Sequence, residues 1–283
     1  MDIDSFWEYT DPVASETRFR AAIPSATADE RLELLTQIAR THSLRGQFAE
    51  AHALLDKVEP HLAQASPRPK ILYGLERGRT YNSNGEKDLA RAEFLRAWQQ
   101  ALAANEAGLA VDAAHMLAIA YSGLPESLTW YQRGLTLARA STAPKAQGLI
   151  PALLNNAAWD LHEAGRFAEA LPVFEQALDT WTASQKPKQI QIARWSVARC
   201  LRSLGRYTEA LAHQHALEAE HRAAGTSDGY VFEEIAENLA ALNRAVEAQP
   251  YFRQAVDALS QDDWFVKNEA TRLARLRALA DTA

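Results

Sequence analysis

Residues 163–174, EAGRFAEALPVF, hold the pattern that decides the fold. Gly165 stands where a helix ends, because glycine adopts the left-handed conformation of a C-terminal cap without a steric penalty. Around it, apolar residues recur at helical spacing. They are Leu154, Ala157, Ala158 and Leu161 before the glycine, and Ala170, Phe174, Ala177 and Leu178 after it. The spacing predicts two helices joined by a tight turn, which is a helical hairpin.

The same pattern recurs along the whole chain. The other copies are LRGQFAEAHALL (44–55), SNGEKDLARAEF (83–94), SLGRYTEALAHQ (203–214) and ALNRAVEAQPYF (241–252), with a shortened copy around Ser127. Their aligned small residues lie about 40 residues apart, at Ala51, Ala90, Ser127, Ala170, Ala210 and Ala248. Asn243 replaces the turn glycine in the last copy, and asparagine also tolerates that conformation. The sequence therefore predicts about six successive hairpins.

These residues resemble the tetratricopeptide repeat (TPR), which has a small and a large residue in its first helix, helix A, and alanine, aromatic, alanine in its second, helix B. The best matches are Gly78, Tyr81, Ala90, Phe94 and Ala97, and then Ala158, Leu161, Ala170, Phe174 and Ala177. The resemblance implies an all-α fold, a right-handed α–α superhelix of about six hairpins with terminal capping helices. The chain is also similar to bacterial TPR proteins described only by their repeats, and this likeness supplies no activity.

The sequence departs from the TPR pattern in three ways. Its period is near 40 rather than 34 residues, which predicts longer helices or linkers. Arg77 occupies a position where helix A normally carries a buried leucine. In residues 118–135, AIAYSGLPESLTWYQRGL, the turn has lost about three residues, so we expect the third hairpin to pack at a different angle.

The resemblance and the terminal sequences predict one solenoid domain over residues 1–283. Residues 1–27 form an N-terminal capping helix, for which Asp11 before Pro12 is a good start. Residues 28–260 form the hairpins, and residues 261–283 form a C-terminal capping helix with Leu273, Leu276 and Ala280 on its apolar stripe. Arrays of repeats need such polar-backed helices to cover their ends.

Composition limits the classes of function. The chain has 283 residues, 47% of them hydrophobic, and a formal net charge of −6, which argues against nucleic acid or an anionic membrane as a partner. Cys200 is the sole cysteine, so no disulfide can form within the chain and a cysteine-based zinc site would lack its other thiolates. We recognise neither a secretory signal nor a stretch long enough to cross a membrane, which predicts a cytoplasmic protein. The sequence has no phosphate-binding glycine loop and no paired histidine metal motif, so we expect no cofactor.

The resemblance also selects candidate binding residues, because helix A of a TPR lines the concave groove. The positions that usually touch ligand hold Arg40, Arg79, Asn82, Asn155, Trp159, His162, Trp195, Arg199 and Arg202. Like positions of stacked hairpins lie side by side, so we expect these residues to form ladders across the groove. Asn155 would bind the backbone of a peptide.

Residues 186–206 carry six cations and no acid. Trp195, Arg199 and Arg202 share one helix face, and arginine forks bind carboxylates with two hydrogen bonds. One interpretation is that this stretch holds an acidic peptide or a C-terminal carboxylate. The alternative is pairing with Glu233, Glu234 and Glu237 of the next helix A, where the shared position would set Glu237 against Arg199.

Two clusters invite a catalytic or metal-binding interpretation. In WDLHEAGRF (159–167), Asp160 and His162 lie about 200° apart on a helix and cannot work as a pair. In HQHALEAEH (213–221), the residues His215, Glu218 and His221 lack the usual spacing of metal ligands and favour a solvated outer face.

The sequence therefore predicts a non-enzymatic scaffold that holds an extended or acidic peptide, or a partner helix, in its groove. A sensory regulator that binds a signalling peptide is the main alternative, and an enzyme with a groove site around His162 is a remote one. A homo-oligomer remains open.

Overall fold

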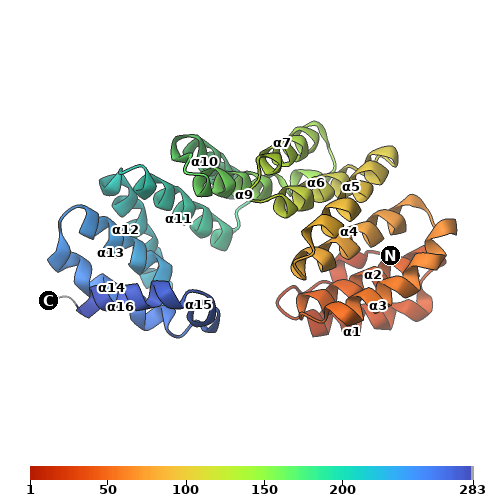
Figure 1. Ribbon diagram of the computed structural model, residues 1–283, viewed down its shortest axis with the longest axis horizontal. Coiled ribbons are helices and arrows are strands. Elements are labelled where there is room, and N and C mark those ends of the chain that lie inside the picture. The colour runs from red at the N-terminus through yellow and green to blue at the C-terminus, as the bar shows by residue number, and fades with distance from the viewer. Residues whose placement is uncertain (282–283) are drawn as a thin grey trace. The chain divides into compact units, whose positions relative to one another are not determined.

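The computed structural model describes residues 1–281, and every regular element within them is a helix. The expected all-α fold of six hairpins is confirmed in this part of the chain (Figure 1). The hairpins are α2 (Ala28–Leu44) with α3 (Phe48–Val58), α4 (Pro67–Ser83) with α5 (Lys87–Ala103), α6 (Ala107–Ala120) with α7 (Pro125–Ala140), α9 (Ile150–Glu163) with α10 (Phe167–Ala183), α11 (Pro187–Ser203) with α12 (Tyr207–Ala223), and α13 (Gly229–Ala241) with α14 (Ala245–Leu259).

Shorter elements flank and link the hairpins. They are η1 (Ile3–Phe6), α1 (Pro12–Ala22), η2 (Ile23–Ser25), η3 (Glu59–Gln64), α8 (Pro144–Gln147), α15 (Asp263–Asn268) and α16 (Ala270–Asp281). Asp11 caps α1 by accepting hydrogen bonds from the backbone N–H groups of Val13 (3.1 Å) and Ala14 (2.9 Å). The proline at the first position of α1 needs no such partner, because it has no N–H.

The hairpin turns close through a left-handed residue at the end of helix A. Gly165 has φ 73°, and the backbone N–H of Arg166 donates to the carbonyl of Leu161 at 2.9 Å. Asn243 takes the same conformation with φ 60°, as its place in the pattern predicts. Any larger side chain branched at Cβ would be strained at these positions.

The third hairpin is shortened at the end of its helix A. The helix α6 ends two residues after Ala118, whereas α4 continues to Ser83, five residues after the matching Gly78. Its turn, residues 121–124, contains Gly123 with φ 82°. The different packing angle expected for this hairpin stays a prediction.

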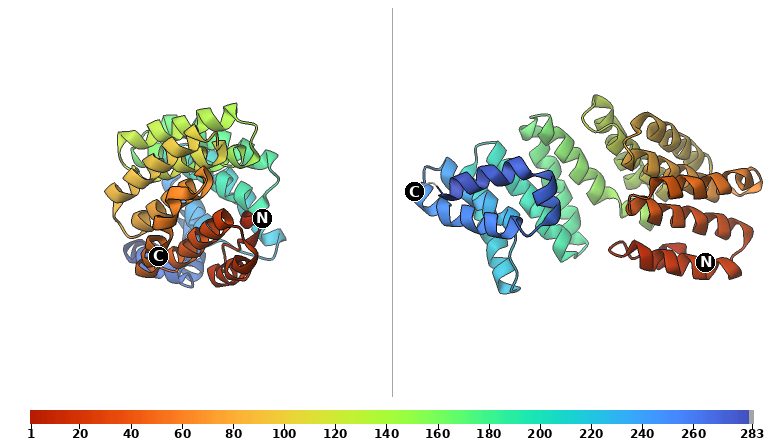
Figure 2. Two further views of the ribbon diagram at one scale, coloured as in Figure 1. Left: turned by 90° about the vertical axis from the view of Figure 1, so that its right-hand side faces the viewer. Right: turned by 60° about the horizontal axis from the view of Figure 1, so that its bottom comes forward.

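The chain divides into two compact units, and the division falls within α9. Unit 1 is Met1–Asp160, and unit 2 is Leu161–Ala283, described as far as Asp281. In Figure 2 the red and orange helices of unit 1 lie side by side, with α1 on α2 and α2 on α4. That the whole chain works as one domain stays a prediction.

Each hairpin packs around the small residues that mark the repeat. Ala90 and Ala170 are fully buried, and Phe94 fills the space beside Gly78. A Cβ atom at Gly78 would lie 2.5 Å from the ring of Phe94, so this position admits no larger side chain without a shift. Burial of a side chain as large as phenylalanine stabilises the fold by about 1.5–3 kcal/mol.

The buried Arg77, at a position usual for leucine, is held by polar partners. Its guanidinium pairs with Asp56, donates to the hydroxyl of Tyr73 at 2.9 Å and lies 3.0 Å from His52 Nδ1. A buried cation needs such partners to offset the loss of water.

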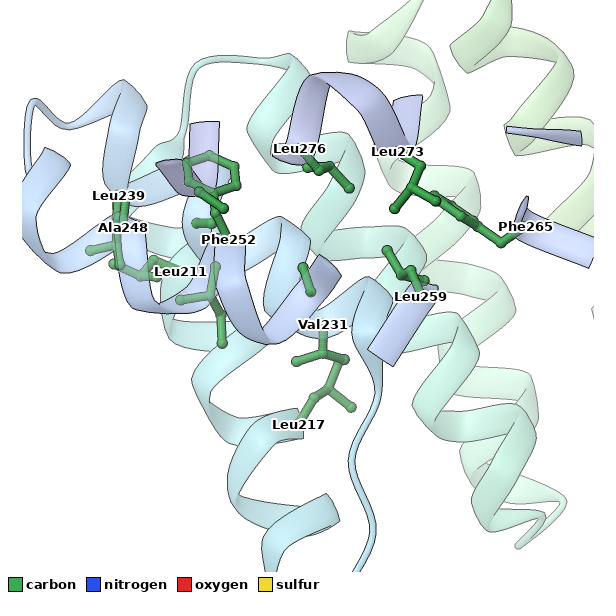
Figure 3. Close-up of a cluster of buried hydrophobic side chains, with 14 residues drawn as sticks. Leu211, Leu217, Val231, Leu239, Ala248, Phe252, Leu259, Phe265, Leu273 and Leu276 are labelled. Carbon is green, nitrogen blue, oxygen red and sulfur yellow. The ribbon is translucent and has the colours of Figure 1, made fainter. Parts of the chain in front are cut away.

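The C-terminal helix α16 packs on α14 and completes the core of unit 2. Figure 3 shows the apolar side chains of this core gathered between α12, α13, α14 and α16. Leu273, Leu276 and Ala280 are buried on one face of α16. Arg272 and Arg275 lie on its other side and meet glutamates of α13.

Candidate functional site

Trp195, Arg199 and Arg202 follow one face of α11, as their spacing of three and four residues requires. Arg202 donates two hydrogen bonds to the carboxylate of Glu234 on α13, from Nε at 2.7 Å and from Nη2 at 3.0 Å. Arg199 places its Nε 3.2 Å from the same carboxylate. Because the side chain of Glu234 is completely buried, one anion fixes both guanidinium groups.

The ion pairs continue from α13 to α16. Glu233 accepts two hydrogen bonds from Arg272, both at 2.7 Å. Glu237 pairs with Arg275 and lies 3.9 Å from Arg202. We call this set the arginine ladder, and its members are Arg199, Arg202, Arg272, Arg275, Glu233, Glu234 and Glu237. Four cations share three anions, so the ladder carries one excess positive charge.

Burial and the neighbouring charges of the ladder together determine the pKa of Arg199. Burial lowers the pKa of this guanidinium below its usual value, and although Glu234 opposes the shift, the cations Arg202 and Arg272 add to it. A further anion beside Arg199 would relieve this repulsion.

The ion pairs of residues 186–206 bear on the pairing interpretation of this stretch, and its binding of a ligand stays a prediction. Arg199 and Arg202 pair with the next helix A, but through Glu234 and not with Glu237 opposite Arg199. The carboxylate of Glu237 is engaged by Arg275, which the pattern of helices A alone does not place. Arg194 pairs with Glu220 and Arg206 with Glu209, while Lys188 makes no ion pair with the acids of residues 1–281.

His162 lies next to the ladder, and its ring is 9% exposed. Its Nε2 is 2.9 Å from the hydroxyl oxygen of Ser203, which also accepts a hydrogen bond from Arg199 at 3.1 Å. Burial, followed by the positive charges of Arg199 and Arg202, lowers the pKa of His162 to about 4. The imidazole is therefore neutral at pH 7 and a weak base, which suits it poorly to activating Ser203.

An apolar groove of about 740 Å³ opens beside Trp195. We call it the α11–α13 groove, and its apolar wall includes Pro187, Ile192, Trp195, Leu217, Tyr230 and Val231. Trp195 is fixed there by a hydrogen bond from Nε1 to the carbonyl of Tyr230 at 3.4 Å. Lys188 stands at the rim. Sequence reasoning found Trp195 but missed the groove. In the structure the groove is marked by Ile192, an apolar side chain that is 52% exposed.

In unit 1, Arg40 and Arg79 lie in a second charged cluster. Arg79 joins two acids: it pairs with Asp112 through Nη2 at 2.6 Å and with Glu76 through Nη1 at 2.7 Å. Arg40 reaches the same oxygen of Glu76 at 3.3 Å. Burial opposes the charge of Arg79, but Asp112 and Glu76 outweigh it and raise the pKa of Arg79.

The segment before α1 lies against this cluster. Trp7 donates a hydrogen bond from Nε1 to the side-chain oxygen of Gln37 at 3.0 Å. The rings of Trp7 and Tyr9 stack at 4.8 Å, and the guanidinium of Arg40 lies about 5.5 Å from both ring centres. Asp4 pairs with Lys145 of α8 at 2.9 Å.

These elements line a half-open cavity of about 320 Å³, which we call the unit 1 cavity. Four acids and four bases stand in its wall: Asp4, Glu33, Glu76, Asp112, Arg40, Arg68, Arg79 and Lys145. Apolar side chains complete it, chiefly Ile3, Trp7, Leu72 and Leu149. Sequence reasoning missed this cavity, because the contribution of residues 3–9 and of α8 depends on contacts far apart in the chain.

The remaining candidates lie elsewhere in unit 1. Asn82 accepts a hydrogen bond from Lys87 at 2.8 Å, and Asn155 donates one to Asn156 at 3.2 Å. Trp159 is half-buried on α9. None of the three lines the unit 1 cavity. As the sequence anticipated, Asp160 turns to a different partner from His162, accepting a hydrogen bond from Ser122 at 2.9 Å.

Within the described residues we looked for metal-binding clusters and for helices that could span a membrane. No group of three or more histidine, cysteine, aspartate or glutamate side chains within residues 1–281 is placed to hold a metal ion. Among the helices of those residues, none is long and apolar enough to cross a membrane. In HQHALEAEH, Glu218 contacts His215 at 3.0 Å and pairs with Arg222 at 2.8 Å.

The sequence matches one family model, the tetratricopeptide repeat, over residues 31–58 and 152–183. No curated protein matches it. Among solved structures, the chain is similar to the apo form of RapI, with 14% identity, 96% of this chain and 81% of that chain covered, and a TM-score of 0.75.

Two further solved structures describe a sensor. The apo form of the quorum sensor NprR from B. thuringiensis is 16% identical over 94% of this chain and 74% of that chain, with a TM-score of 0.64. NprR in complex with its cognate peptide NprX is 18% identical over 98% of this chain and 82% of that chain, with a TM-score of 0.57. At these identities the likeness establishes the fold.

Proposed function

The chain is a tetratricopeptide-repeat protein, and from that premise we propose that it is a non-enzymatic scaffold that binds a peptide or partner segment of acidic character through unit 2. The observation that carries the proposal is the excess positive charge of the arginine ladder beside the open α11–α13 groove. TPR hairpins present surfaces of this kind to extended peptides and partner helices.

The arrangement of Trp195 and Arg199 supports a ligand that has both an apolar side chain and a carboxylate. A carboxylate at Arg199 would neutralise the fourth cation of the ladder, and guanidinium groups bind carboxylates strongly. Trp195 lies one helical turn before Arg199, a rise of about 6 Å. An apolar side chain of the ligand would enter the groove at Trp195 while a neighbouring carboxylate meets Arg199, so the two features lie within about two residues of each other in an extended peptide.

The remaining residues that the sequence predicts as ligand contacts are supported less well by the structure. Arg40, Arg79, Asn82, Asn155 and Trp159 belong to unit 1, where Arg40 and Arg79 already share two carboxylates. The neutral, weakly basic His162 favours a binding role over a catalytic one.

A sensory regulator is the second candidate, favoured by the likeness in fold to the quorum sensor NprR. In that case the bound peptide would change the conformation of the chain. X-ray scattering with and without a selected peptide separates the candidates: compaction on binding supports a sensor, and an unchanged profile supports a static scaffold.

The test of the proposal is selection from a displayed library of random twelve-residue peptides, followed by titration of the winners. We expect enrichment of sequences with an aromatic or aliphatic residue within two positions of Asp or Glu. Arg199→Gln should weaken binding of the selected peptides about tenfold or more, because a hydrogen bond to a charged group contributes about 1.5–3 kcal/mol.

Arg194→Gln is the matched control, since Arg194 lies on the same helix but pairs with Glu220 outside the ladder. It should bind the peptides as the unchanged protein does. Enrichment of basic sequences, or equal weakening by the two substitutions, would contradict the proposal.

A further inference from the structure

The α11–α13 groove lies where the first turn of α13 is missing. Each helix A has a buried small residue, which is Ala198 in α11 and Ala236 in α13. The helix α11 begins at Pro187, eleven residues before Ala198, and α2, α4 and α6 begin at the same distance from theirs, whereas α13 begins at Gly229, only seven residues before Ala236. The groove is lined by the first half of α11, the end of α12, the loop 224–228 and the start of α13. It therefore has the place that one more turn of α13 would take beside α11.

Unit 1 shows how this place is filled when the turn is present. Arg68 of α4 matches Lys188 of α11, because each is the second residue of its helix and follows a proline. The guanidinium of Arg68 lies 3.4 Å from the carboxylate of Glu106, the residue just before α6, and 3.3 Å from that of Glu33. Leu109, three residues after Glu106, is 1% exposed. The start of α6 thus brings an acid to the cation of α4 and buries a leucine.

In unit 2 the matching side chains are exposed in the groove. Lys188 makes no ion pair with the acids of residues 1–281. Ile192, one turn later, is 52% exposed, whereas the matching Leu72 of α4 is 7% exposed. Asp228 also lines the groove, but it caps α13 by accepting a hydrogen bond from a backbone N–H of the first turn at 2.8 Å. The groove therefore offers a cation and an apolar surface whose counterparts are covered in unit 1.

A separate short helix already fills a similar gap in unit 1. The helix α9 begins at Ile150, eight residues before Ala158, so it too lacks most of a first turn. The four-residue helix α8 precedes it and packs on α6, and its Ala146 is fully buried. A Cβ atom at Gly108, the second residue of α6, would lie 2.9 Å from the Cβ of Lys145 in α8. The fold therefore accepts a turn of helix here that is not continuous with helix A.

These features fit a turn of helix with an acid at its start and an apolar residue three positions later. The acid would meet Lys188 as Glu106 meets Arg68, and the apolar residue would cover Ile192. We propose that an acidic peptide enters the α11–α13 groove as such a turn and takes the place of the missing turn of α13. The inference rests on the proposed function and adds a second acid to the ligand, since the residues after the turn lead on toward Arg199.

The test is titration of the full chain with labelled synthetic peptides. The first, ANEAGLAVDA, copies residues 104–113 from the start of α6 and keeps the acid three residues before the leucine. The second, ANAEGLAVDA, puts the acid two residues before the leucine, which is the spacing of one face of an extended strand. We expect the first to bind with saturation and the second to bind about threefold or more weakly, because its acid does not reach Lys188.

Protein variants assign the contact to Lys188. Lys188→Glu should weaken binding of the first peptide about threefold or more, and a peptide with lysine in place of the glutamate should bind this variant better than the unchanged chain. Lys186→Glu is the matched control, because Lys186 lies 5.6 Å from the ring centre of Trp181 and does not line the groove. Both lysines are exposed, so neither substitution disturbs the core.

Three results would overturn the inference: no saturable binding of the first peptide up to about 5 mM, equal affinity of the two peptides, or equal weakening by the two lysine variants. Arg199→Gln separates this inference from the proposed function. If the library-selected peptides depend on Arg199 but not on Lys188, the helical turn is wrong and the proposed function stands. If they do not depend on Arg199, the proposed function itself fails.

Discussion

The two units give arginines on helix A opposite surroundings. In unit 1, Arg40 and Arg79 share two carboxylates, those of Glu76 and Asp112. In unit 2, Arg199 and Arg202 share the single buried carboxylate of Glu234. Against the effect of burial, Asp112 and Glu76 raise the pKa of Arg79, whereas burial, with the cations Arg202 and Arg272, lowers the pKa of Arg199.

Arg79 and Arg199 hold the same position in their repeats. The charge of Arg79 is neutralised by carboxylates of the fold, whereas Arg199 belongs to a cluster with one more cation than anions. The difference comes from the neighbouring helices: α6 supplies Asp112 to Arg79, whereas α13 supplies three acids to four arginines, two of which come from α16. A repeat position predicts the face on which a side chain lies, and only the neighbours decide whether it is available to a ligand.

The largest effect that tests this comparison is on stability. Arg79→Gln leaves the buried carboxylate of Glu76 and the partly buried carboxylate of Asp112 short of a cation, and it should lower the free energy of unfolding by about 3–5 kcal/mol. Arg199→Gln should lower it by about 1 kcal/mol or less, because Arg202 still neutralises Glu234. Urea denaturation measures both, and similar losses in the two variants would show that the units do not differ in this way.

The hairpins could be predicted because local physics decides them. The conformation of Gly165 and the helical spacing around Ala170 depend on a few neighbouring residues, and they recur in each copy. Long-range partners could not be predicted in the same way. The ion pair between Arg199 and Glu234 depends on how α13 and α16 pack, and the contact of Trp7 with Arg40 depends on a segment that no repeat describes.

The second prediction tests what the units have in common, their packing. A Cβ atom would lie 2.5 Å from Phe94 at Gly78 in unit 1 and 2.8 Å from Leu259 at Gly229 in unit 2. Gly78→Ala and Gly229→Ala should each lower the free energy of unfolding by about 1–3 kcal/mol, the usual cost of overpacking. Thermal unfolding is the measurement.

Gly74→Ala, on the same helix α4 as Gly78, is a useful control for this pair. Its Cβ atom would lie 3.4 Å from the Cβ of Ala97, which is an ordinary van der Waals distance. A loss as large as that of Gly78→Ala would mean that the close approach of Phe94 is not the cause.

The third prediction concerns the positive field of the arginine ladder, for which His162 serves as a probe. Its pKa is about 4 in the folded chain, against about 6.5 when unfolded. Between these values the unfolded chain binds more protons, so stability falls as pH falls from about 6.5 to about 4. We expect this group to account for about 1–3 kcal/mol of the loss, and His162→Asn to remove that part of the pH dependence.

The same probe connects the ladder to its proposed ligand. A carboxylate bound at Arg199 would offset the positive charges that lower the pKa of His162, so a bound acidic peptide should raise that pKa toward 6.5. The NMR titration of the imidazole follows this directly. Unit 1 supplies the contrast, because the charges that act on His115 are those of Asp112 and Arg79 and not those of the ladder, so its titration should not respond to the peptide. If the pKa of His162 stays fixed while the peptide binds, the carboxylate is not at Arg199, and the excess charge of the ladder has another role.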